Sequence, residues 1–449
     1  MSNSSIYQDI QSLTGVGGAS QVWDYNVEII ADGVVVQTTT VNRIDYNRDY
    51  SNVYGSVISC VVTVGYTTFV NRVYPSRDAL RVKIRRRRRI VETNSIDFTG
   101  AEYQTYTALL ASPTDIGATA KTKTDDRPEE RETLEQVDVV LQLSELAMFE
   151  SRMHQVGGIF RNTTTFDLLK VLMAPALDGS QNADTLNQPD YAGIRGVDVV
   201  RPTNNIVHEH IIIPPSTALV DLPEYLQENT KGVYSSGIGY FLQAGIWHIW
   251  PLRDYTQYTK RKRTLTIVML PKADTPFLEQ SYKLNGDNVI IASTGDVSIE
   301  DNVQSAELHA GTGMRYIRAS SLLDKLTTVS ANKSTFNKTD TLKEVSFTER
   351  KDGLTNAKFA KDIFTDNPYA AMSAISKAMS RSLSITWTNS DHQLLYPGMP
   401  VKVLQDNGGV VKETIGILAG QTTVIASNSD GIVDTAMYSN TAMRINIEL

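Results

Sequence analysis

The sequence is poor in cysteine and has no long apolar run. Its single cysteine, Cys60, excludes an intramolecular disulfide, and the flanking VISCVVTV predicts a small apolar residue inside a strand. No stretch approaches the roughly 18 consecutive apolar residues of a membrane span, so membrane insertion is not expected. Residues 1–20 have neither a basic start nor an apolar core, which argues against a secretion signal. Stability is therefore expected from packing or assembly.

An excess of positive charge is also lacking. The 43 basic and 50 acidic residues give a net charge of -7, so the chain as a whole is not expected to bind nucleic acid or a membrane surface. At 449 residues, with 41% hydrophobic residues, it is long enough for about two to four domains. Its 28 glycines, 20 tyrosines and many Thr, Val and Ile residues predict an α+β fold that is mainly β.

Changes in composition predict six segments. They are a flexible N-terminal arm (1–19), a first β domain (20–133), a small α/β domain (134–205), part of a second β domain (206–275), a polar insert domain (276–380) and a C-terminal β meander that completes the second β domain (381–449). In the first β domain Asp32-Gly33 predicts a type I′ hairpin, and strands are expected at 57–64, 67–74 and 79–88. The result would be a small antiparallel sheet or barrel.

Helices are expected at a few places in the rest of the chain. Residues 145–154 follow the strand-like VDVVLQL, Thr165 marks a second helix start, Asp221 can cap a third helix, and 368–380 is a fourth candidate. Residues 174–205 read as mostly loop. Short strands are expected at 289–292 and 314–318.

The segment 211–271 predicts a short helix, an aromatic strand pair and then a basic edge. Aromatic and aliphatic residues recur on one parity between 233 and 250, which suits strands with one buried face. On that parity Tyr240 and Trp250 are expected in the subunit's core, and Trp247, on the other face, in a subunit interface.

Two pentapeptides share the form aromatic, Pro, any residue, Arg, Asp. They are 74–78 and 250–254, and a basic run follows each of them, at 85–89 and 260–263. They indicate either a coincidence or a duplicated β module.

The basic runs are the sharpest electrostatic feature of the chain. Five consecutive arginines repel one another and need solvent, carboxylates or phosphate nearby. Because alternate strand residues point to opposite faces, and no aromatics interleave, a strand edge paired with carboxylates, including those of a neighbouring subunit, is favoured over DNA contact. The candidate assembly-interface residues are Arg85, Arg86, Arg87, Arg88, Arg89, Arg253, Asp254, Lys260, Arg261, Lys262 and Arg263.

No catalytic, metal or cofactor site is predicted. His208 and His210 share a strand face but lack an evident third ligand, so ordinary surface or interface histidines are favoured over a metal site. Cys60 has no basic neighbour to lower its pKa. The glycine-rich stretches 15–18 and 235–241 lack the Lys-Ser or Lys-Thr of a phosphate-binding loop. We therefore expect a protein that is not an enzyme.

The order of several segments resembles the tail or baseplate hub proteins of tailed bacteriophages. The segments are NRVYPSRDALRVKI, YTALLAS, LQLSELAMFESRMHQVGGIFRNTTTFDLLKVLM, IIIPPSTALVDLPEYLQ, GVYSSGIGYFLQAGIWHIWPLRD and YPGMPVKVL. Individually they are weakly specific, but together they cover nearly the whole chain. The polar stretch 276–350 matches no hub motif.

This resemblance implies a homotrimer with two tube-like β domains per subunit, joining a sixfold tail tube to a threefold central spike in the virion. Its partners would be the tail tube and central spike proteins, with tape measure and wedge proteins as further candidates, and genomic DNA would pass without specific binding. Two alternatives are a tail-associated cell-wall hydrolase, although no carboxylate pair can be assigned, and a receptor-binding tail protein, although no fibrous repeat is visible.

Overall fold

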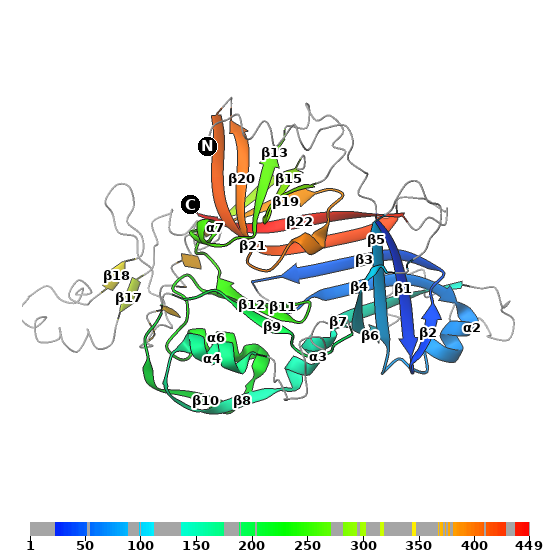
Figure 1. The fold of residues 1–449 in the computed structure, drawn as a ribbon, viewed down its shortest axis with the longest axis horizontal. Helices are drawn as coiled ribbons and strands as arrows, with labels where there is room; N and C mark the ends of the chain where they lie inside the picture. The colour runs from blue at the N-terminus through cyan, green and yellow to red at the C-terminus, as the bar shows by residue number, and fades with distance from the viewer. Residues whose placement is uncertain are drawn as a thin grey trace, which may run out of the picture.

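The computed structural model describes most of the chain as a mainly β architecture (Figure 1). The described residues are 23–51, 54–88, 98–111, 136–174, 188–270, 282–301, 315–317, 344–346 and 367–448, with gaps at 99, 189, 203, 294–296, 408–409, 428–435 and at several positions between 368 and 379. The predicted arm (1–19) and most of the predicted polar insert lie outside these residues.

The first barrel is a closed antiparallel ring of strands. Going around it, the strands are β1 (Trp23–Ala31), β5 (Arg81–Arg88), β6 (Glu102–Leu110), β7 (Gln136–Glu145), β4 (Val57–Gly65), β3 (Thr40–Asp49), β21 (Val410–Ser427) and β22 (Ala436–Glu448), which returns to β1. Strand alternation points side chains such as Val27, Ile29 and Val82 into a continuous apolar core. The predicted strands at 57–64 and 79–88 are confirmed, and β7 belongs to this barrel although the domain prediction placed it with the α/β domain.

A short strand, β2 (Val34–Gln37), forms the predicted hairpin with β1. Asp32 and Gly33 have φ angles of 48° and 79°, which is the positive pair that a type I′ turn requires.

The strand predicted at 67–74 is wrong, because this segment is helical. It forms α2 (Tyr66–Thr68) and the π-helix η1 (Phe69–Val73). Strands β4 and β5 are not neighbours in the barrel, so the chain must cross between them, and a hairpin strand cannot make that crossing. Val73 is buried in the barrel core and Phe69 packs against this core, so β-branched and aromatic residues of a helical segment fill part of the barrel interior.

Two long C-terminal strands run through both β domains. The first part of β21 pairs with β20 (Pro400–Asn407), and its second part pairs with β3. The change occurs at an irregularity between Leu418 and Gly420, where the carbonyl of Ala419 accepts a hydrogen bond from the Tyr50 amide (3.0 Å). The C-terminal segment therefore contributes strands to both β domains.

The second β domain is an open barrel. Its sheet runs in the order β16 (Val297–Asp301), β19 (Ser380–Trp387), β22, β21, β20, β13 (Thr264–Met269), β15 (Asn288–Ser293) and β14 (Tyr282–Asn285). The Ser293 hydroxyl donates to the Thr386 carbonyl (2.8 Å), so the sheet curls until β15 faces β19. Strand β13 is parallel to both neighbours and buried on both faces, as parallel strands usually are.

A smaller α/β unit lies below the second barrel and to the left of the first in Figure 1. It contains α3 (Leu146–Met153), β8 (Gln155–Thr163), α4 (Thr165–Leu172), β9 (Gly196–Val199), β10 (His208–Ala218), the 3-10 turn η3 (Leu219–Asp221), α6 (Leu222–Glu228), β11 (Ile238–Gln243) and β12 (Ile246–Pro251). Sheets β8-β10 and β11-β12-β9 share a core with α3, α4 and α6. The predicted helices at 145–154, Thr165 and Asp221 are confirmed, although the Asp221 side chain makes no capping hydrogen bond. Strand β9 lies in the predicted loop region.

The aromatic strand pair is buried on both faces, not on one. The two-residue turn at Ala244 and Gly245 pairs Leu242 with Trp247 and Tyr240 with Ile249. Even-numbered residues of β11 therefore share a face with odd-numbered residues of β12, so the parity of the buried residues inverts across the turn. Trp247 is fully buried in the α/β core, and the prediction that it lies in a subunit interface is wrong. Trp250 is in the core of the second barrel as predicted, whereas Tyr240 is half-buried on the α/β side.

The two similar pentapeptides do not mark equivalent elements. The first follows η1 and leads into β5, which is antiparallel to both neighbours. The second lies at the end of β12 and leads through α7 (Gln257–Lys260) into β13, which is parallel to both neighbours. The duplication that they suggested is not supported at these positions.

The predicted short elements near the insert are present. Strand β15 covers 289–292, β17 (Arg315–Ile317) matches 314–318 and pairs with β18 (Glu344–Ser346), and the described positions of 369–377 are helical. None of the helices described is long and apolar enough to cross a membrane.

Candidate assembly surface and the loop between the barrels

The arginine run forms most of β5, an interior strand of the first barrel. The prediction of a strand edge is wrong, because β1 and β6 flank β5 along its length. The predicted alternation is present: Arg86 is buried on the core-facing parity of Val82 and Ile84, and Arg85 and Arg87 are half-buried on the other face. Arg88 is exposed, and Arg89 lies outside the described residues.

Arg86 is held by carboxylates of its own chain. Its guanidinium bonds Asp391 (2.7 Å) and Glu102 (2.9 Å) and lies 4.3 Å from the ring centre of Trp23. Burial alone would lower the pKa of Arg86, but its neighbours, Asp391 most of all, raise it above its ordinary value. This side chain is therefore turned to the interior of the subunit and not to a partner.

The outer face of β5 carries a second intrachain pair. Arg85 bonds Glu28 of β1 (3.1 Å), and the Lys83 ammonium lies 3.6 Å from the ring centre of Tyr103. Carboxylate pairing was thus predicted correctly, but for Arg85 and Arg86 the carboxylates come from the same subunit.

The second basic cluster surrounds α7 and the start of β13. Arg253 is half-buried, donates to the Ser380 hydroxyl (3.2 Å), and has its pKa lowered by burial. Asp254 accepts from the Thr256 amide (3.2 Å) and so begins the turn of α7. Lys260 and Lys262 are exposed.

Arg261 and Arg263 of this cluster have intrachain partners. Arg261 pairs with Asp198 of β9 (3.3 Å), whose pKa is lowered by the hydrogen bond from His248 and by the Arg261 charge. Arg263 is exposed and donates to the Leu394 carbonyl (2.8 Å).

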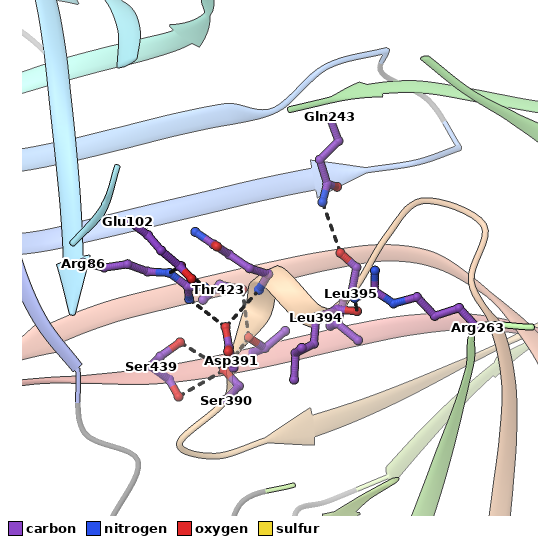
Figure 2. A network of polar contacts seen from close by, with 12 residues as sticks. Arg86, Glu102, Gln243, Arg263, Ser390, Asp391, Leu394, Leu395, Thr423 and Ser439 are labelled. Carbon is purple, nitrogen blue, oxygen red and sulfur yellow. Dashed lines mark hydrogen bonds and ion pairs between the residues drawn. The ribbon is translucent and has the colours of Figure 1, made fainter. Parts of the chain in front are cut away.

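The two basic runs meet at one loop, the segment between β19 and β20, which we call the joint loop (388–399). Figure 2 shows its short helical turn, η6 (His392–Leu394), held from several sides. Arg86 reaches it from the first barrel and Arg263 from the second, while Gln243 of the α/β unit donates to the Leu395 carbonyl (3.1 Å). The loop therefore ties the three parts of the subunit together.

The joint loop is also anchored through hydroxyl groups. The Ser390 hydroxyl lies 2.7 Å from that of Thr441 and 3.0 Å from that of Ser439, and Thr441 lies 2.8 Å from the Thr423 hydroxyl. All of these side chains are buried. Sequence reasoning missed this loop, and the available signal was Asp391, which accepts from the Gln393 amide (3.4 Å) and caps the turn.

The histidine and cysteine candidates lie in two different parts of the fold. His208 and His210 lie on β10 opposite Thr163 and Arg161, and the described residues contain no group of three His, Cys, Asp or Glu side chains that could hold a metal ion. Cys60 is fully buried in the first barrel, and burial raises the pKa of its thiol to about 12.

No family model matches the chain, and no curated protein matches it. Among solved structures it is similar to the tail protein from Neisseria meningitidis MC58, at 14% identity over 94% of this chain and 96% of that chain, with a TM-score of 0.47. It is similar to the 43 kDa tail protein of prophage MuSo2 from Shewanella oneidensis, at 12% identity over 94% and 98%, with a TM-score of 0.45. It is also similar to the c3393 protein of E. coli, a component of the type VI secretion system, at 11% identity over 93% and 76%, with a TM-score of 0.40.

Proposed function

We propose that this chain is a structural protein of a phage tail, a homotrimeric hub in the baseplate that joins a sixfold tail tube to a threefold central spike. The observation that carries the proposal is that one chain builds two β-barrels on a continuous sheet, joined by β21 and β22. Three such chains would present six barrels in a ring, which is the number needed to match sixfold and threefold partners. The order along the chain of the segments that resemble hub proteins supports the same assignment.

The joint loop adds a mechanical argument for a hub. A subunit between two partners must transmit load from one barrel to the other without unfolding. Here the barrels share two strands and are also connected through Arg86 and Arg263 to the same loop. The proposed partners are the tail tube protein and the central spike protein, with tape measure and wedge proteins as further candidates and genomic DNA passing without specific binding.

The oligomeric state tests this proposal directly. We expect the purified chain to run at three times the 49.7 kDa subunit mass in light scattering at micromolar concentration. Native mass spectrometry of the same sample should give the same stoichiometry. A stable monomer or dimer across the concentration series would contradict the hub assignment. Electron cryomicroscopy of the particle should then place the trimer on the tail axis.

The exposed lysines beside α7 are the part of the predicted interface that we propose faces a neighbouring subunit. Replacing Lys260 and Lys262 together by glutamate is expected to weaken trimer association about tenfold, or ~1.4 kcal/mol, because a charge at an interface rim is reversed. The effect should shrink in high salt. Sedimentation velocity over a dilution series measures it.

A matched control is Lys170→Glu, a charge reversal on the exposed face of α4. It should leave the sedimentation profile unchanged. Equal effects of the two variants would show that only net charge matters and would remove these lysines from the interface.

A further inference from the structure

The inner end of the first barrel contains buried polar atoms that no described protein atom satisfies. They are Arg48 Nη1, Glu145 Oε1, both ring nitrogens of His392, and the side-chain amide nitrogen and oxygen of Gln421. All four residues are buried. A buried polar atom without a partner costs about 1–3 kcal/mol, so this many would approach the whole stability of a domain.

Arg48 links these side chains, because it lies near Gln421 and His392 and its charge acts on Glu145. Arg48 and Gln421 are direct cross-strand partners on β3 and β21. The Arg48 guanidinium carbon lies 5.1 Å from the ring centre of Tyr46, and the His392 ring centre lies 4.6 Å from it. Burial lowers the pKa of His392 and raises that of Glu145, and the nearby charge of Arg48 lowers both.

Arg48 and Glu145 attract each other but do not touch. Among the described residues, no carboxylate lies within 4.0 Å of Arg48, and no cationic group lies within that distance of Glu145. Arg48 Nε donates to the Ser56 hydroxyl (3.1 Å), and Glu145 Oε2 accepts from the Gly245 amide (3.3 Å). One donor atom of the cation and one acceptor atom of the anion are thus left without a hydrogen-bond partner among the described residues.

The mixture of unpartnered donors and acceptors identifies the kind of molecule that can bind them. Arg48 Nη1, the Gln421 amide nitrogen and one nitrogen of neutral His392 are donors, and Glu145 Oε1, the Gln421 oxygen and the other His392 nitrogen are acceptors. An anion would leave the acceptors unmatched and a cation the donors. Water both donates and accepts, and it satisfies two to four partners at such sites.

Solvent can reach the Glu145 side of this group. A surface cavity of about 210 Å³ opens beside β6 and is lined by Glu145, Tyr46 and Tyr106, and the Arg48 guanidinium lies against the Tyr46 ring. At about 30 Å³ per water molecule it has room for several.

We propose that ordered water occupies the inner end of the first barrel and bridges Arg48 to Glu145, with His392 and Gln421 completing its hydrogen bonds. The bridge connects β3, β7, the joint loop and β21. Glu145 also accepts a hydrogen bond from the Gly245 amide in the turn between β11 and β12. The first barrel, the joint loop and the α/β unit would therefore contact one another through bound water and not only through apolar side chains.

A density map of the native protein at about 2 Å resolution or better tests the site without any substitution. We expect a water oxygen within hydrogen-bond distance of both Arg48 Nη1 and Glu145 Oε1. Direct contact between guanidinium and carboxylate, a dry gap, or an ion recognised by anomalous scattering would overturn the proposal.

A thermal-unfolding cycle tests the coupling that the bridge implies. Arg48→Met and Glu145→Gln should each lower the melting temperature by several degrees, and the double variant should lose little more than the worse single variant. Additive losses would mean that no bridge joins the two side chains. Arg43→Met and Asp45→Asn provide the control cycle, since that pair is partly exposed to solvent, at 53% and 30%, on the same strand and should show little coupling.

Discussion

Replacing Asp391 by alanine is expected to lower the free energy of unfolding by about 3–5 kcal/mol, because it leaves Arg86 charged and buried without its closest counterion. The side chains of Arg86 and Asp391 are only 8% and 6% exposed, so water cannot replace the lost carboxylate. The second partner of Arg86, Glu102, is 69% exposed and compensates little. Guanidinium denaturation followed by tryptophan fluorescence measures the loss.

The matched control is the other carboxylate on the same guanidinium. Glu102→Gln should cost at most about 1 kcal/mol, because its pair with Arg86 is open to solvent on the glutamate side. The double variant Arg86→Met/Asp391→Ala should recover much of the stability that Asp391→Ala loses, since both buried charges are then absent. If Asp391→Ala cost no more than Glu102→Gln, the joint loop would not depend on this ion pair.

The joint loop also shows which contacts of the arginine run could be predicted from the sequence and which could not. The arginine run and its alternation could be read from the sequence, since strand geometry is local. The partner could not, because Asp391 lies 305 residues from Arg86 and approaches it only through the shared strands β21 and β22. A basic run therefore indicated a carboxylate partner but not whether that carboxylate belonged to the same subunit.

The same limit applies to the strand assignments. The hairpin at Asp32-Gly33 could be predicted because two adjacent residues determine a type I′ turn. The helical segment at 66–73 could not be predicted, because its β-branched residues fit a strand equally well. Only the crossover between the non-adjacent strands β4 and β5 decides between helix and strand. Likewise, the parity of the aromatic pair inverts because of the turn at Ala244, a residue type that rarely adopts a positive φ.

Trp247 provides the sharpest test of that inversion. Trp247→Ala is expected to lower the free energy of unfolding by about 3–5 kcal/mol, because the indole is fully buried between its own sheet and the helices of the α/β unit. Unfolding should be measured at two protein concentrations, since any trimer contributes its own concentration-dependent term. Ile159→Ala, at a side chain that is 63% exposed on β8, should change stability little and is the control. An interface tryptophan would behave differently: its loss would weaken association while the subunit stayed folded. A concentration-independent loss of stability therefore assigns Trp247 to the core, and an association defect alone would return it to the interface.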